Sequence, residues 1–247
     1  MQACRTQKEA TIFLDKQAFF CLFEQNNIYL KGPTNLTSRE QKNSIKLLRN
    51  NCLVDAEGIP IISREDLPKL SGMLSFHEIR QGDQRAKEES LLIHFFKDDY
   101  VFNKLYEEPD AKHSMDKVKQ LAQYTAVSSP DFSLYPEMPL PVQEFQIFKN
   151  RWCGAHWQSL GLHVFPTVTW GDEKSYSFCF AGIEKHSTVV VSTVGCRTSP
   201  NEFLRGYNRM LEVINPETII CYGTPFSNME GNIISFPYAT FRKEASA

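Results

Sequence analysis

The chain has 247 residues, of which 42% are hydrophobic, and its formal net charge is -2 at pH 7. This length and apolar content suffice for one large domain with a full core, or for one domain with a smaller appendage. The near-neutral charge excludes a protein whose whole surface neutralises phosphates, but it leaves a local basic face open.

Cysteine usage and the first residues indicate a cytoplasmic protein. The seven cysteines are odd in number and form no C-x-x-C pair, which excludes a complete disulfide framework and a zinc ribbon. Met1 is followed by polar and charged residues, and no run approaches the roughly 18 apolar residues that span a bilayer. We therefore expect reduced thiols and no membrane association.

The first fifty residues contain a candidate basic helix. Gly32-Pro33 ends a short apolar patch, and Thr37 and Glu40 have the spacing of a capping box, which predicts a helix over 38–50. Its cations recur at helical spacing at Arg39, Lys42, Lys46 and Arg49. They could follow the phosphates of a nucleic acid or form an ordinary solvated face, and no aromatic residues interleave them for base stacking.

Residues 53–79 predict irregular structure, and residues 80–89 have the composition of an exposed linker. His77-Glu78 does not continue into a zinc helix, because Gln81 stands where the second histidine would be. We expect a boundary here, with an N-terminal extension over 1–89 that carries the basic helix and an α/β domain over 90–247.

From Leu91 onward, short apolar runs alternate with helical patterns. The predicted strands are Leu91–Phe96, Thr125–Ser128, His163–Val168, Thr188–Thr193, Thr218–Tyr222 and Asn232–Phe236. Runs that are apolar on both faces are typical of parallel sheets, so the fold class is α/β with a mostly parallel sheet and crossover helices. An incomplete β/α-barrel-like arrangement and an open doubly wound sheet both fit, and polar residues at many strand ends slightly favour the barrel.

Two helices between these strands have clear start and stop signals. One begins with Ser199 as N-cap and Pro200 in the first turn, and Asn215-Pro216 ends it. The other follows Pro139 and ends at Gly161, a residue suited to a left-handed cap. Its expected inward residues are Phe145, Phe148, Trp152 and Ala155. The segment Tyr176–Gly182 fits either a strand or a short helix.

Polar residues follow several predicted strands, and the carboxyl ends of parallel strands are where α/β proteins bind ligands. The candidate catalytic residues are Asp98, Asp99 and Asp131. Their carboxylates could hold a divalent cation or divide general acid and general base roles. The candidate ligand-binding residues are Ser133, Arg151, Thr167, Trp170, Ser192, Thr193 and Tyr222.

Each candidate also has a purely structural interpretation. Asp131 could form a turn or helix cap that satisfies backbone amides. Trp170 could stack on a sugar or base, whereas core packing is the ordinary role of a tryptophan. Ser133 lacks the glycines of a nucleophile elbow, which argues against an acyl-enzyme. We expect His94 and His163 to be core residues of strands.

Seven segments also carry a resemblance, in this order: Leu92–Tyr100, Ser129–Ser133, Asn150–Trp152, Phe165–Trp170, Phe178–Gly182, Val191–Gly195 and Tyr222-Gly223. Together they resemble domain-of-unknown-function family 4417 of phages and integrated bacterial mobile elements, over about residues 90–240. The resemblance implies a phage or mobile-element context and supplies no catalytic roles.

Two functions from different classes remain. The first is an intracellular enzyme, hydrolytic or metal-assisted, that binds a polar phosphorylated or nucleotide-like ligand at the strand ends. The second is a noncatalytic accessory module that binds nucleic acid or a host protein through the basic helix. The sequence assigns no cofactor or metal.

Overall fold

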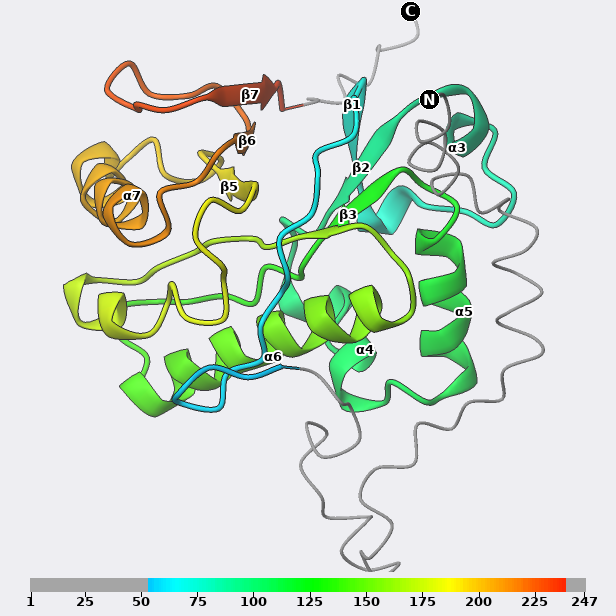
Figure 1. Cartoon of the computed structure of the whole chain (residues 1–247), viewed down its shortest axis with the longest axis horizontal. Coiled ribbons are helices and arrows are strands. Elements are labelled where there is room, and N and C mark those ends of the chain that lie inside the picture. Colours follow the sequence, from blue (N-terminus) through cyan, green and yellow to red (C-terminus); the bar gives the residue numbers. More distant parts are fainter. Residues whose placement is uncertain (1–52, 239–247) are drawn as a thin grey trace, which may run out of the picture. The chain divides into compact units, whose positions relative to one another are not determined.

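The structure is a computed structural model that describes residues 53–238 (Figure 1). The candidate basic helix, with Arg39, Lys42, Lys46 and Arg49, lies outside these residues. The strands are β1 (Gly72–Ser75), β2 (Leu91–His94), β3 (Ala126–Ser128), β4 (Val164–Phe165), β5 (Val189–Ser192), β6 (Ile219–Tyr222) and β7 (Ile233–Phe236). The α-helices are α3 (Arg85–Glu88), α4 (Lys104–Glu107), α5 (Lys112–Leu121), α6 (Leu140–Ser159) and α7 (Pro200–Ile214). Short 3-10 helices are η2 (Phe76–Glu78), η3 (Asp99–Val101) and η4 (Glu173–Ser177).

The strands form two parallel sheets in chain order, β1-β2-β3-β4 and β5-β6-β7. A parallel bridge between Thr167 and Val190 connects them just beyond β4, with the Val168 amide donating to the Val190 carbonyl at 2.9 Å. The strand order never reverses, whereas a doubly wound sheet requires a reversal at its switch point. The mostly parallel α/β fold is therefore confirmed, and the order is that of a β/α barrel.

Alternating side chains show that the joined strands curl around an interior. A buried cluster brings together one residue from each of five successive strands. Its members are Leu92, Ala126, Phe165, Val190 and Ile220, and Met73 of β1 and Phe236 of β7 pack against it. Residues from β2 and β6 share this cluster although three strands lie between them, so the arrangement is barrel-like rather than open and flat.

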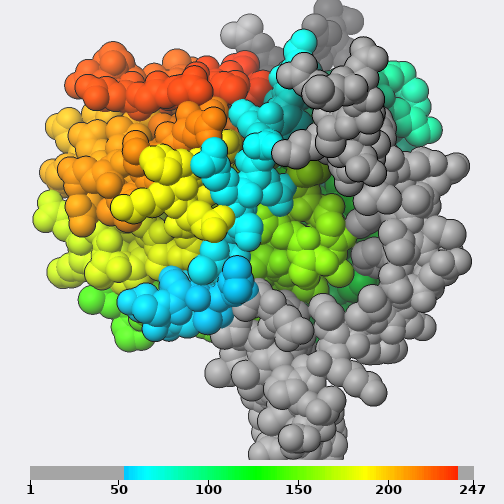
Figure 2. Space-filling model, viewed as in Figure 1, coloured from blue at the N-terminus to red at the C-terminus, as the bar shows by residue number. Residues whose placement is uncertain are grey.

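The residues between these interior positions face the helices, because side chains of a strand alternate between its two faces. Val189, Val191, Ile219 and Cys221 pack against Phe203, Tyr207, Met210 and Ile214 of α7. Figure 1 shows α5, α6 and α7 outside the curled strands. In Figure 2 the β7 segment, in red, lies along the orange segment of α7 and β6.

The six strands predicted from apolar runs are all present and each is shorter than predicted, most of all β4, which is reduced from His163–Val168 to Val164–Phe165. β1 was missed, because Gly72 and Ser75 interrupt the apolar pattern of a strand of only four residues. β1 pairs in parallel with β2, and residues 53–238 belong to one compact unit. The boundary expected near residue 89 thus falls inside a continuous sheet.

Helix details differ from the sequence patterns in three places. α7 begins at Pro200 as predicted, but the Ser199 side chain makes no capping hydrogen bond. Phe145 is 51% exposed instead of inward, because Gln143 and Gln146 take the inward positions at that end of α6. The ambiguous segment Tyr176–Gly182 forms the end of η4 and turns rather than a strand.

The two strand histidines have different environments. His94 is buried as expected. The expectation for His163 is wrong, since it lies just before β4 with its side chain 64% exposed and its Nδ1 2.9 Å from a Glu65 carboxylate oxygen.

Candidate functional site

Because the strands are parallel, the segments that follow them gather at one end of the curled sheet. We call this end the carboxyl rim and define it by residues 96–99 and 129–133, which follow β2 and β3, and by residues 192–197 and 222–224, which begin with the last residues of β5 and β6. This is the end at which β/α barrels carry their ligand sites. It contains Asp98, Asp99, Asp131, Ser133, Ser192, Thr193 and Tyr222.

An aromatic group connects β2 and β6 at this rim. The rings of His94 and Tyr222 are 4.1 Å apart, and Phe96 stacks on Tyr222 at 5.6 Å. Burial lowers the pKa of His94 to about 3, so its imidazole is neutral near neutral pH. Burial raises the pKa of Tyr222 to about 12. These side chains therefore present uncharged rings, and they hold the two sides of the rim together.

Asp99 is fixed by residues that follow β3 and by α6. Its Oδ1 accepts hydrogen bonds from the Ser133 hydroxyl at 2.8 Å and from the Ser133 amide at 3.1 Å. Its Oδ2 accepts from Gln146 Nε2 at 3.2 Å. The structure thus brings Asp99 and Ser133 together, as the strand-end argument predicts, and occupies the Ser133 hydroxyl in positioning Asp99.

Asp131 has an unusual environment. Its Oδ1 atom is enclosed and has no hydrogen-bond partner among the described residues, although part of the residue reaches solvent. Burial raises the pKa of Asp131 from 3.8 to about 7, and the nearby Asp99 charge adds to the increase. A cap would use this carboxylate to accept amide hydrogen bonds, and none is made to Oδ1.

A buried polar network holds the backbone on both sides of Asp131. Asn150 of α6 donates to the Pro130 carbonyl at 2.6 Å and accepts from the Ser129 hydroxyl at 2.7 Å. Thr167 donates through its hydroxyl to the Ser129 carbonyl at 2.6 Å. These bonds connect the residues after β3, the residues after β4 and α6, so the position of Asp131 is set by a network with its own partners satisfied.

Arg151 makes its contacts within the protein. Its guanidinium donates to the carbonyls of Ala181, Cys179 and Thr167 at 2.9, 2.9 and 3.0 Å, and also to Asn150 Oδ1. The side chain is fully buried, and burial lowers its pKa to about 10. The guanidinium therefore connects α6 to the segments around Thr167 and η4.

Ser192 and Thr193 are mainly engaged with the end of β6. The Ser192 hydroxyl donates to the Tyr222 carbonyl at 3.3 Å, and the Thr193 hydroxyl donates to the Thr224 carbonyl at 2.9 Å. Ser192 stays partly exposed, while Thr193 is buried.

Trp170 and Asp98 do not join the Asp131 group. The Trp170 indole lies against Gly206 of α7 and 5.1 Å from the Phe203 ring, in the core outside the sheet. Asp98 is exposed, next to Asp99. Of the sequence candidates, the structure thus groups Asp99, Ser133 and Asp131, with Thr167 behind them.

Sequence patterns did not indicate Gln146, Asn150 or Cys196 as part of this region. Burial raises the pKa of the Cys196 thiol, and the Asp131 charge adds to this increase. A polar residue repeated on the inward face of a helix, as Gln146 and Asn150 are, is the one signal that could have revealed the first two.

Within residues 53–238, no group of three or more His, Cys, Asp or Glu side chains could hold a metal ion. No helix in that range is both long and apolar enough to cross a membrane. Cys153, Cys179, Cys196 and Cys221 are free thiols.

Fold and rim together define an all-parallel, barrel-like α/β protein with polar residues gathered at its strand ends. The chain belongs to the family described as Domain of unknown function (DUF4417), whose model matches residues 53–239. The match starts before β1, whereas the resemblance in the sequence covered only about residues 90–240.

Two relatives are phage proteins. The "Gene 1 protein" of Mycobacterium phage L5 is 38% identical over 147 residues, which are 58% of this chain and 62% of the relative. The "Gene 1 protein" of Mycobacterium phage D29 is 35% identical over 134 residues, 53% of this chain and 48% of the relative. The chain thus spans about half to three fifths of the length of these relatives. No solved structure matches it.

Proposed function

We propose that the carboxyl rim binds a small polar ligand and that Asp131 contacts it. The observation that carries this proposal is the enclosed Oδ1 atom without a hydrogen-bond partner. Buried polar atoms are nearly always paired, so an unpaired one at the ligand-binding end of this fold has hydrogen-bonding capacity left for a ligand.

The Asp131 carboxyl group is suited to proton transfer. With a pKa of about 7, both its carboxyl and carboxylate forms are populated near neutral pH. Such a group can donate a proton to a ligand or accept one, which is the property of a general acid or base. Burial is the main cause of this pKa, and the charge of Asp99, which Ser133 and Gln146 hold in place, raises it further.

Arg197 gives a reason to expect an anionic group on the ligand. It is exposed in the segment after β5 and lies close enough to lower the pKa of Cys196, which also responds to the Asp131 charge. Its guanidinium lies over the Phe226 ring at 4.5 Å and donates to the Thr224 carbonyl, so it is held in place. A phosphorylated or nucleotide-like substrate of a hydrolytic enzyme fits these groups best.

A thermal-shift experiment tests the proposal. Nucleoside monophosphates, sugar phosphates and inorganic phosphate are added to the parent protein, to Asp131→Asn and to Asp98→Asn at neutral pH. Asp98→Asn is the matched control, because it removes an exposed carboxyl from the same rim. We expect at least one ligand to raise the Tm of the parent and of the control but not of Asp131→Asn. Equal shifts in all three proteins, or no shift with any compound, would count against the proposal.

The alternative function, an accessory module that binds nucleic acid or a host protein, rests on the basic residues of the 38–50 segment. Charge reversal at Lys42 and Lys46 with the rim unchanged separates the two functions. Loss of oligonucleotide binding in that variant would favour the accessory module, and retained ligand shifts would favour the rim.

A further inference from the structure

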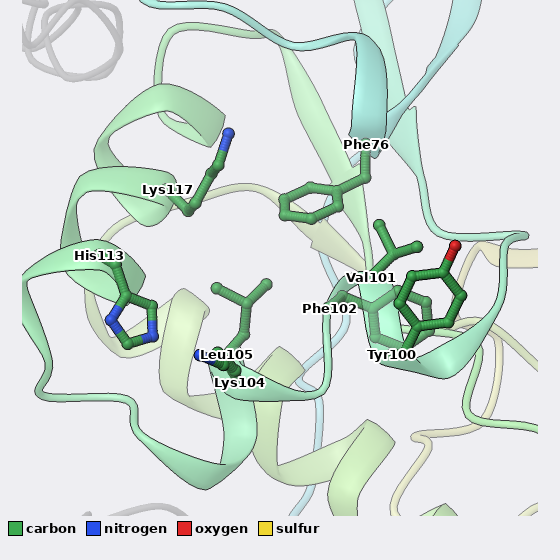
Figure 3. A pocket seen from close by; sticks show the side chains of 8 residues that line it. All are labelled: Phe76, Tyr100, Val101, Phe102, Lys104, Leu105, His113 and Lys117. Carbon is green, nitrogen blue, oxygen red and sulfur yellow. The ribbon is translucent and has the colours of Figure 1, made fainter.

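A small pocket lies beside the segments that follow β1 and β2, and neither Asp131 nor Asp99 lines it. We call it the α5 pocket, and its volume is about 170 Å³. Its lining residues are Phe76, Tyr100, Val101, Phe102, Lys104, Leu105, His113 and Lys117. Figure 3 shows Lys117 and His113 projecting from α5 on one side and Phe76, Val101 and Tyr100 on the other.

The floor of the α5 pocket is apolar and fixed. Phe102 and Leu105 are buried, and Phe76 stacks on Phe95 with ring centroids 4.7 Å apart. Phe95 also meets Phe102 edge-on at 5.6 Å. Tyr100, in contrast, is 80% exposed at the edge of the pocket. A rigid aromatic floor with an exposed tyrosine beside it is typical of sites that receive an anchoring side chain.

Lysine side chains border this floor. Lys104, His113 and Lys117 line the pocket, and no lining residue is acidic. His113 already contacts Glu108 at 3.4 Å. Lys117 lies 5.9 Å from the Phe76 ring centroid and donates to Gln120 at 3.0 Å. Within the described residues neither lysine makes a salt bridge, so both ammonium groups remain available to pair with carboxylates.

We propose that the α5 pocket binds an acidic peptide segment of a partner protein, with one aromatic side chain in the pocket and flanking carboxylates at Lys104 and Lys117. The volume is below the roughly 300 Å³ at which sites for whole small ligands begin, and it suits one ring. The positive edge selects negative flanks. This inference is independent of the proposal for Asp131.

A random peptide library selected on the full chain tests this inference. The chain carrying Lys104→Gln and Lys117→Gln serves for counter-selection. We expect enriched peptides to contain an aromatic residue flanked by Asp or Glu. In fluorescence anisotropy, a synthetic peptide of this kind should bind the double variant at least tenfold more weakly than the parent. The matched control is Lys87→Gln with Lys112→Gln, which removes the same charge from exposed positions that do not line the pocket, and it should bind like the parent.

Peptide changes complete the test. Replacement of the aromatic residue by Ala should weaken binding at least tenfold, and added salt should weaken it further. Enrichment of peptides without acidic residues, or equal binding to both double variants, would overturn the inference. Benzoate that displaces the peptide at equal concentration would also overturn it, since the pocket would then be a site for a small anion.

Discussion

At the scale of single residues, Asp131 combines features that stability alone does not favour. Its Oδ1 is enclosed without a partner, and its pKa is raised from 3.8 to about 7 by burial and by Asp99. Desolvating a carboxyl without hydrogen bonds costs free energy that an apolar residue would not. Such costs are common where a side chain is retained for binding or catalysis.

Asp131→Asn should change how stability depends on pH. The folded parent holds the Asp131 proton up to a higher pH than the unfolded chain does, so this group stabilises the fold fully below about pH 4 and loses that contribution as pH rises to about 7. Relative to the variant, the parent should lose roughly 4 kcal/mol across this window. Denaturant unfolding at several pH values measures this loss. His94 also has a shifted pKa, but it is present in both proteins, so its contribution cancels in the comparison. A difference that stays constant from pH 4 to 7 would mean an ordinary aspartate.

At the scale of secondary structure elements, buried polar and aromatic contacts decide how the helices sit on the sheet. Arg151 joins α6 to the carbonyls of Thr167, Cys179 and Ala181, and Trp170 packs on α7 at Gly206. Both residues were ligand-binding candidates from sequence, and both have partners within the core.

Arg151→Met should destabilise the fold by roughly 3 to 5 kcal/mol, because it leaves buried carbonyls without their donor. Denaturant midpoints measure the loss. Arg209→Met on the exposed side of α7 is the control and should cost less than about 1 kcal/mol. Similar midpoints for Arg151→Met and the parent would show that Arg151 is not structural.

Gly206→Ala should also destabilise the protein, by about 1 kcal/mol or more, because the new Cβ would lie 2.2 Å from Trp170 Nε1. This loss exceeds the usual gain from replacing a helical glycine by alanine. Thermal unfolding checks it, with Asn208→Ala on the exposed face of α7 as control. Combination with Trp170→Phe should reduce the loss, and an undiminished loss would contradict the packing.

Strand positions could be predicted because strands that are buried on both faces consist of consecutive apolar residues, as in residues 189–191 and 219–221. The position of Asp131 near Asp99 followed from the rule on parallel strand ends. The orientations of Arg151 and Trp170 could not be predicted, because long side chains take partners from segments distant in sequence. Gln146 enters the site from a helix face whose direction depends on tertiary packing.

At the scale of the whole described unit, the sheet curls until β2 and β6 meet. The His94 and Tyr222 rings, 4.1 Å apart, form this contact. It places the segments after β2, β3, β5 and β6 around one rim.

A double-mutant cycle on His94→Leu and Tyr222→Leu tests the closure. We expect a coupling energy of about 0.5 to 1.5 kcal/mol, as for aromatic pairs in contact. His94→Leu with Tyr207→Leu is the control, since Tyr207 belongs to the core cluster outside the sheet, and this pair should be additive. Additivity of the His94 and Tyr222 changes would indicate that the strands do not close.

The most direct test of the proposed site is an NMR titration of the Asp131 carboxyl carbon in the parent and in Asp99→Asn. We predict a pKa of about 7 in the parent and a lower value in the variant, because the variant removes the Asp99 charge. A pKa near the ordinary 3.8 in the parent would contradict the account, since Asp131 would then be an ordinary ionised carboxylate at neutral pH.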